Sequence, residues 1–227
     1  MAFGDVAVDH LGPVRDFPGS SMLAGLIGNA LGWDYRDRNA LQSLQDRLVF
    51  GARRDREGSR LIDVQNVSLD RADWGWTTHG VPEGRTGSSY AAPHRRRRDY
   101  EADAALTLVM RLEPAGELPQ IEEIARALDR PARPLFLGRK PCLPSTPLLS
   151  PGAARWVVAG NAYEALCALP GVGRACRALW PAGEGPEDEL DSAGTVRDLQ
   201  DRRNWLRGLH GGSRRVVEGS LPAGEAP

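Results

Sequence analysis

The chain has 227 residues, of which 41% are hydrophobic, and this is enough to bury the core of one large domain or two small ones. Its formal net charge of −1 excludes a uniformly basic coat, so any contact with nucleic acid must come from locally segregated charge. The three cysteines form no Cys-x-x-Cys pair, which excludes a disulfide scaffold and a zinc module and indicates a reducing compartment. No apolar run approaches the ~18 residues of a membrane span, and the first residues resemble no secretory signal. We therefore expect a cytoplasmic protein.

The first part of the chain predicts two helices. Over residues 20–32 the apolar side chains recur at helical spacing, a serine can cap the start, and Gly32 can end the last turn. A shorter helical pattern continues over residues 41–48, where leucines recur at four-residue spacing or close to it.

Two short strands follow, at residues 48–52 and 61–64, and the charged turn between them favours a hairpin. From residue 66 to residue 94 the composition changes to Gly, Ser, Thr, Arg and Asp, with three aromatic residues interspersed: Trp74, Trp76 and Tyr90. This stretch is too polar for a core and too aromatic for a simple linker. Such a long insertion indicates a function.

The next elements complete a familiar order. Residues 104–112 predict the best strand of the chain, residues 119–129 an amphipathic helix, and residues 135–137 a brief strand. This order is that of a β-α-β-β-α-β ferredoxin-like unit without its opening strand, so the predicted fold class is α+β. We expect this domain to span residues 1–150.

Residues 151–227 are punctuated by proline and glycine and predict a smaller, irregular C-terminal region. We expect a strand at 156–158, a helix at 163–169 and an acidic loop at 184–191.

The missing opening strand would lie at the centre of a ferredoxin-like sheet. Its absence leaves rows of backbone groups unpaired, at ~1 to 3 kcal/mol for each buried unsatisfied group. We therefore expect the natural protein to begin upstream of Met1. The alternative is that residues 2–10, where Val6 and Val8 alternate with polar residues, replace the strand in shortened form.

The strongest polar feature is a run of five potential cations: His94, Arg95, Arg96, Arg97 and Arg98. RNA phosphates would supply the counter-charge and give an affinity that falls with salt. A solvated loop is the alternative for a charge run considered alone. Because aromatic residues precede the run in the insertion, stacking combined with charge favours a surface for single-stranded nucleic acid.

Two further sites suit an anion. Arg139 and Lys140 follow a predicted strand beside a glycine, where a backbone can approach a phosphate, and an exposed turn is an equally good interpretation. The start of the first helix, at Ser20 and Ser21 with Arg15 close by, offers free N–H groups and the positive end of a helix dipole.

Catalytic patterns are absent from the sequence: it contains no Walker A motif, no dinucleotide-binding loop, no Gly-x-Ser-x-Gly and no His-Glu-x-x-His. We therefore expect a non-catalytic protein with no metal and no cofactor. The alternative is a metal-independent endoribonuclease in which His94 acts with Tyr90 or Tyr100 and the arginines. A small-molecule-binding domain is a third possibility, and no pocket signature supports it.

Three ordered segments resemble the CasD family, the crRNA-handle-binding subunits of type I-E CRISPR Cascade complexes. They are residues 17–32 (FPGSSMLAGLIGNALG), 98–104 (RDYEADA) and 134–142 (PLFLGRKPC). Ser20 stands where the family usually has a basic residue, so a phosphate contact there falls to backbone N–H groups, the hydroxyl or Arg15.

The resemblance implies an RNA-recognition-type ferredoxin-like domain in which residues 66–94 form a thumb-like hairpin. It implies a non-catalytic subunit that binds the 5′ handle of crRNA and caps one end of the complex in antiviral defence. The implied partners are the crRNA, the backbone repeat subunit and the large PAM-reading subunit. Some related type I-C subunits instead cut CRISPR repeat RNA, which keeps the endoribonuclease as the alternative. By motif position the RNA-facing residues are Ser20, Ser21, Arg98, Tyr100, Arg139 and Lys140.

Overall fold

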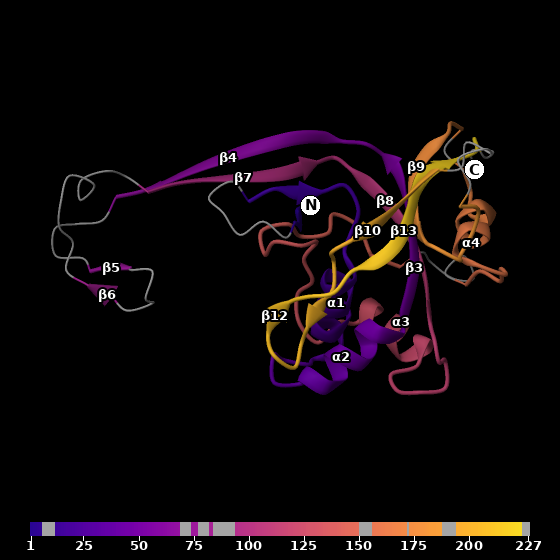
Figure 1. Cartoon of the computed structure of the whole chain (residues 1–227), viewed down its shortest axis with the longest axis horizontal. Helices are drawn as coiled ribbons and strands as arrows, with labels where there is room; N and C mark the ends of the chain where they lie inside the picture. Colours follow the sequence, from indigo (N-terminus) through magenta and orange to yellow (C-terminus); the bar gives the residue numbers. More distant parts are fainter. Residues whose placement is uncertain are drawn as a thin grey trace.

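In the computed structural model, a long two-stranded ribbon projects from a body built of one sheet and the helices on its two faces (Figure 1). The structure describes residues 1–5, 12–68, 74–76, 82–83, 94–149, 156–171, 173–187 and 194–223. No helix in these ranges is both long and apolar enough to cross a lipid bilayer.

The body centres on a five-stranded antiparallel sheet in the order β10-β13-β9-β3-β8. Its strands are β3 (Leu48–Arg56), β8 (Ala105–Leu112), β9 (Cys176–Pro181), β10 (Gly194–Leu199) and β13 (Arg214–Leu221). β3 pairs with β8 along most of its length and with β9 only at Ala52 and Arg53. β8 ends the sheet, and within the described ranges no backbone hydrogen bond forms along its outer edge.

Helices cover both faces of this sheet. Successive residues of a strand point to opposite sides, so each strand contributes side chains to the packing on both faces. One face carries α1 (Ser20–Leu31), α2 (Arg38–Arg47) and α3 (Ile121–Asp129), whose apolar side chains pack with Phe50 of β3 and Leu112 of β8. The other face carries α4 (Ala162–Ala168), and a Cβ added at Gly51 would lie 3.0 Å from Leu166 of that helix. The order α1, β3, β8, α3, with α1 and α3 on one face, confirms the expected α+β, ferredoxin-like fold and the predicted helices.

The ribbon consists of β4 (Ser59–Val67) and β7 (His94–Ala102), which pair from Ser59 opposite Ala102 to Val67 opposite His94. The expected hairpin between residues 48–52 and 61–64 is therefore wrong, because β3 pairs with β8 and β9 and β4 pairs with β7. Gly58 permits this separation: its φ of +74 turns the chain out of the sheet, and a Cβ there would lie 2.5 Å from the Ala102 carbonyl oxygen. The ribbon starts before and ends after the expected insertion bounds of 66–94.

Three other expectations differ from the structure. Residues 135–137 form no strand, and the chain there makes a single bridge between Ala2 and Gly138. Residues 156–158 are irregular, and Val158 is 101% exposed. Residues 176–181, 194–199 and 214–221, which belong to the expected irregular C-terminal region, form β9, β10 and β13 of the main sheet. Ala178 and Trp180 of β9 are buried in its core.

The start of the chain lies outside the five-stranded sheet. β1 (Phe3–Gly4) pairs with β2 (Val14–Arg15) in a small sheet of their own. The shortened replacement strand expected for residues 2–10 is thus not formed by residues 2–4, and residues 6–11 lie outside the described ranges.

Candidate nucleic-acid interface

The arginines of β7 lie on two opposite faces of the ribbon. Residues directly opposite in an antiparallel pair share a face, and neighbours along one strand alternate. Arg96 and Arg98 therefore lie on the same face as Tyr100, while Arg95 and Arg97 lie on the other. The strand divides the four arginines of the charge run into two pairs, which a solvated loop would not do.

The face that carries Arg98 and Tyr100 meets the body where the ribbon begins. The guanidinium of Arg139 lies 5.2 Å from the centre of the Tyr100 ring and donates from Nη1 to the Asp99 carbonyl oxygen at 2.8 Å. Its Nη2 donates to the carbonyl of Gly12. A Cβ at Gly12 would lie 2.7 Å from Arg98 Nη1 and 2.9 Å from Arg139 Nη2, so both arginines close around that glycine. We call Arg98, Tyr100 and Arg139 the root cluster.

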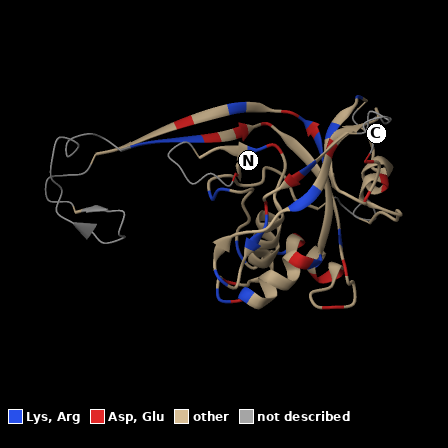
Figure 2. Ribbon diagram, in the orientation of Figure 1, with Lys and Arg blue, Asp and Glu red and all other residues tan. Residues whose placement is uncertain are grey.

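Carboxylates form ion pairs with only some of the basic side chains of the ribbon. Asp99 lies 3.2 Å from Arg97 and 3.4 Å from Arg60, and Glu101 lies 3.7 Å from Arg60. Figure 2 shows acidic and basic residues interspersed along the two strands of the ribbon. Three exposed cations of the ribbon and of the Arg139 turn pair with no carboxylate of the described residues: Arg95, Arg96 and Lys140.

Arg54 of β3 joins the ribbon to the sheet. Its side chain is only 2% exposed, and its Nη2 lies 2.7 Å from the carboxylate of Glu101, the residue that follows Tyr100. Its Nε lies 2.9 Å from the Glu57 carboxylate, and its Nη1 donates to the Asp16 carbonyl oxygen at 2.6 Å. Sequence reasoning missed this residue, because a charged turn was expected at that point and nothing in the sequence indicated burial.

The start of α1 is closed to an outside anion. Ser20 is 2% exposed, and its backbone N–H donates to the Asp201 carboxylate at 3.0 Å. The Ser21 N–H donates to the Asp201 carbonyl oxygen at 2.9 Å, and Arg15 lies 2.7 Å from Asp5. A carboxylate of the same chain thus occupies the position where a phosphate was expected.

Arg214 completes this buried unit. Its Nε lies 2.9 Å from the Asp201 carboxylate, and its guanidinium lies 4.1 Å from the centre of the Phe50 ring. Burial lowers the pKa of Arg214, while the neighbouring Asp201 opposes that shift. The unit therefore joins α1, β3 and β13 and contributes to the core.

The remaining predicted residues are only partly placed. Trp74 is 67% exposed, Trp76 belongs to β5 (Gly75–Trp76), which pairs with β6 (Pro82–Glu83), and Tyr90 lies outside the described ranges. His94 and Tyr100 are residues of one strand and lie about 20 Å apart at roughly 3.3 Å per residue. That separation does not allow the two to act as a proton-transferring pair, whereas a pair of His94 and Tyr90 stays a prediction.

Comparison with known proteins identifies the family. The family model described as "CRISPR-associated protein (Cas_Cas5)" matches residues 1–217. The chain belongs to the Cas5 family of CRISPR-associated proteins.

Relatives of this Cas5 chain agree with the match. The "CRISPR system Cascade subunit CasD" of Escherichia coli (strain K12) is 29% identical over 148 residues, which are 65% of this chain and 64% of that relative, slightly less than two thirds of its length. Two solved structures are similar to the Cas5 chain with a TM-score of 0.64. A chain of a "CRISPR RNA-guided surveillance complex" is 22% identical, and the match covers 99% of this chain and 86% of that chain. A second structure, described as "Crystal structure of Cas protein", is 26% identical, and the match covers 100% of this chain and 92% of that chain. The resemblance to the CasD family is thereby confirmed.

Proposed function

We propose that this Cas5 chain is a subunit of a CRISPR surveillance complex that binds the 5′ handle of crRNA at the root of its ribbon. The observation that carries the proposal is the root cluster, in which Arg98, Tyr100 and Arg139 come together from separate motifs. The exposed Arg96 on the same face of the ribbon and Lys140 beside Arg139 add charge that no described carboxylate neutralises.

The chemistry of these groups suits a single-stranded RNA. Arginine presents a planar fork of donors to phosphate oxygens, and an aromatic ring offers a base a surface for stacking. The tertiary contacts of Arg139 hold one guanidinium in place before RNA arrives, which reduces the entropy lost on binding.

In this proposal the chain caps one end of the complex in antiviral defence as a non-catalytic, cytoplasmic subunit. Its neighbours are the backbone repeat subunit and the large PAM-reading subunit. The E. coli relative is a Cascade subunit, which supports a place in such an assembly. The long separation of His94 and Tyr100 supports the absence of catalysis by that pair.

A pair of matched variants tests the RNA site. Replacing Arg96 and Arg98 with alanine removes two ribbon cations, and replacing Arg126 and Arg130 with alanine removes two exposed cations at the end of α3. We expect only the first variant to bind handle RNA less tightly, and its plot of log affinity against log salt to flatten by about 1.4, roughly 0.7 for each lost phosphate contact to a single strand. Equal losses in both variants would contradict the site.

Incubation of the pure protein with CRISPR repeat RNA in EDTA tests the non-catalytic part. The proposal predicts that the RNA stays intact, and specific cleavage would establish the endoribonuclease instead.

A further inference from the structure

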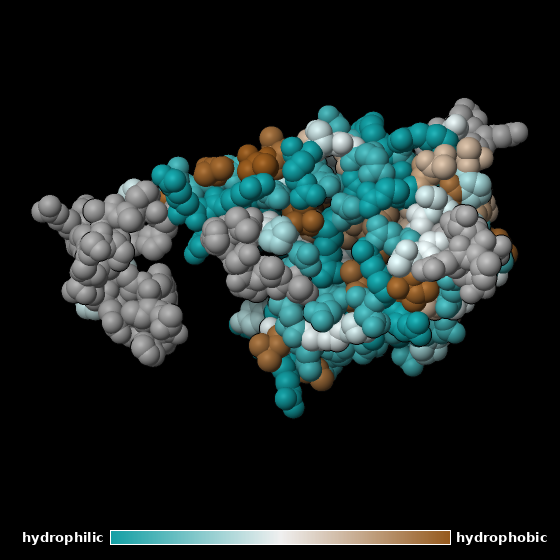
Figure 3. Space-filling model, turned by 45° about the horizontal axis from the view of Figure 1, so that its top comes forward, coloured by the Kyte–Doolittle hydropathy of each residue, from teal (hydrophilic) through white to brown (hydrophobic). Residues whose placement is uncertain are grey.

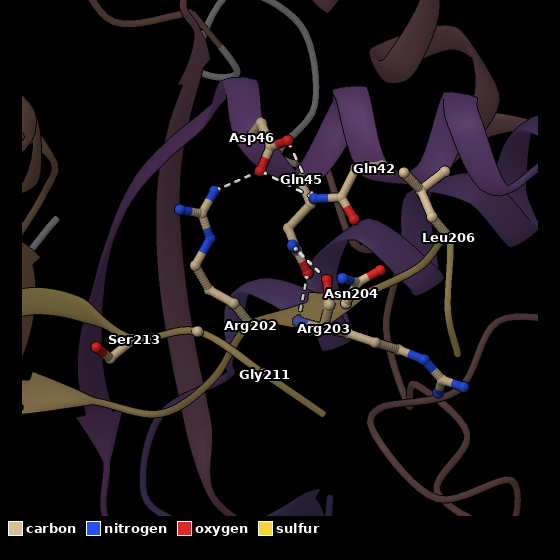
Figure 4. A pocket seen from close by; sticks show the side chains of 10 residues that line it. Gln42, Gln45, Asp46, Arg202, Arg203, Asn204, Leu206, Gly211 and Ser213 are labelled. Carbon is tan, nitrogen blue, oxygen red and sulfur yellow. Dashed lines mark hydrogen bonds and ion pairs between the residues drawn. The ribbon is translucent and has the colours of Figure 1, made fainter. Parts of the chain in front are cut away.

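A small hairpin at the foot of the body is held against α2 by buried polar contacts. It consists of β11 (Arg203–Asn204) and β12 (Leu209–His210). Gln45 of α2 is 2% exposed; its Nε2 donates to the Arg203 carbonyl oxygen at 2.9 Å, and its Oε1 accepts from the Arg203 N–H at 3.0 Å (Figure 4). The same oxygen accepts from Trp205 Nε1 at 3.1 Å, and Trp205 packs against the core around α1. The turn of this hairpin is therefore fixed.

The hairpin exposes large apolar side chains to solvent. Leu206 is 48% exposed and Leu209 is 64% exposed. Tyr35, in the turn that leads into α2, is 69% exposed. Figure 3 shows apolar atoms among hydrophilic ones at the lower edge of the body. Large apolar groups presented by a rigid turn on a soluble protein mark a contact surface.

Arginines without carboxylate partners surround these apolar groups. Arg36, Arg38 and Arg207 are exposed, and none of them forms an ion pair with a described residue. Arg38 Nη1 donates to the Leu206 carbonyl oxygen at 3.1 Å, which joins the start of α2 to the hairpin turn. The Arg36 guanidinium lies 5.5 Å from the centre of the Tyr35 ring. The foot surface, as we call it, comprises Tyr35, Arg36, Arg38, Leu206, Arg207 and Leu209.

Four carboxylates of the described residues lie near the foot surface, and each has partners of its own. Asp46 and Glu117, which line hollows shared with Leu206, lie 2.6 Å from Arg202 and 3.8 Å from Arg47, respectively. Asp34 and Asp37 belong to the turn itself. Asp34 Oδ1 accepts the Arg36 N–H at 2.6 Å, and Asp37 Oδ2 accepts the Asp34 N–H at 2.7 Å. They hold the turn in shape and leave the outward arginines uncompensated. These carboxylates also repel phosphates, and Tyr35 alone among the residues of the foot surface offers a ring on which a base could stack. These features favour a protein over a nucleic acid as the occupant.

We infer that the foot surface docks a neighbouring protein whose contact surface has apolar side chains ringed by carboxylates. Tyrosine and arginine around a buried apolar centre are the residues that dominate binding energy in protein interfaces. The foot lies at the end of the body away from the ribbon, so the protein and the RNA can be bound together (Figure 1). The inference rests on the proposed function in one respect: the neighbour is sought among the subunits of the surveillance complex.

The test uses the chain co-expressed with the other subunits encoded beside it and their guide RNA. Leu206→Asp with Leu209→Asp, and separately Arg38→Glu with Arg207→Glu, should each reduce the recovery of one protein subunit about tenfold. Val158→Asp, at a fully exposed position on another part of the body, should leave recovery unchanged. Recovery of every subunit at the wild-type level in both foot variants would overturn the inference.

A photo-crosslinking amino acid at position 209 identifies the occupant directly. We expect a crosslink to a single protein subunit at a segment that contains aspartate or glutamate. A crosslink only to RNA, or to nothing, would overturn the inference. Handle-RNA binding by the isolated wild-type chain is measured alongside. Failure of the wild-type chain to bind the RNA would overturn the proposed function, whereas the crosslink tests the foot surface separately.

Discussion

Replacing Arg54 with methionine tests how the ribbon is joined to the sheet. The Arg54 side chain is 2% exposed, and the substitution leaves the Glu101 carboxylate, whose side chain is 9% exposed, without its partner at 2.7 Å. Breaking a buried pair from one side costs about 3–5 kcal/mol, because the remaining charge is buried and loses its main partner. Glu101 keeps only the half-exposed Arg60, 3.7 Å away. Glu57 is 44% exposed, so its carboxylate regains water and adds little to that cost.

Urea denaturation measures the expected loss in the free energy of unfolding, and a thermal scan should show a fall of roughly 6–20 °C for a chain of this size. Arg60→Met is the matched control, because Arg60 is 41% exposed and lies 3.7 Å from the same Glu101. It should cost less than about 1 kcal/mol. The double variant Arg54→Met with Glu101→Leu should recover much of the stability, since no charge is then left buried. The reasoning is refuted if Arg54→Met costs no more than Arg60→Met, or if the double variant is as unstable as the sum of its parts.

Two further predictions follow from the same contacts. Gly12→Ala should reduce the free energy of unfolding by about 1–3 kcal/mol and weaken handle-RNA binding, because φ is +56 and the new Cβ would lie 2.7 Å from Arg98 Nη1. Gly4→Ala is the control, because nothing lies within 4 Å of the Cβ added there. It should change neither stability nor RNA binding. Hydrogen bonding to Arg111 lowers the pKa of Glu184 below its ordinary 4.5, so the stability it contributes is present above about pH 4.5 and is lost as the pH falls through the folded-state pKa. Urea midpoints of the wild type and Glu184→Gln should therefore differ at neutral pH and converge as the pH falls through the lowered pKa of Glu184, and a gap that is constant over the whole acid titration would contradict the assignment.

Helix α1 could be predicted from the sequence, whereas the strand that contains the arginine run could not. The apolar spacing and a left-handed Gly32, with φ of +86, define α1 locally, and the structure places it at Ser20–Leu31. The run from 95 to 98 has no alternation of apolar and polar residues, so nothing local indicates a strand. Only its pairing with β4 makes it one, and that pairing is a tertiary event.

The residues of the candidate site could be predicted from the sequence, but their contacts could not. The motifs contained Arg98, Tyr100 and Arg139, but their meeting around Gly12 depends on the path of the whole chain. Asp201, 181 positions from Ser20, closes the start of α1, and no spacing in the sequence connects the two. β9 was overlooked because proline and glycine on either side suggested irregular chain, although its alternate residues Ala178 and Trp180 share one buried cluster.

Photo-crosslinking from 4-thiouridine placed along the 5′ handle of crRNA tests the central claim most directly. Bound at the root of the ribbon, the handle should crosslink to peptides from β7 and from the Arg139 turn, and the yield should fall in the variant that lacks Arg96 and Arg98. Crosslinks confined to the foot surface, or to the start of α1 that Asp201 closes, would contradict the claim.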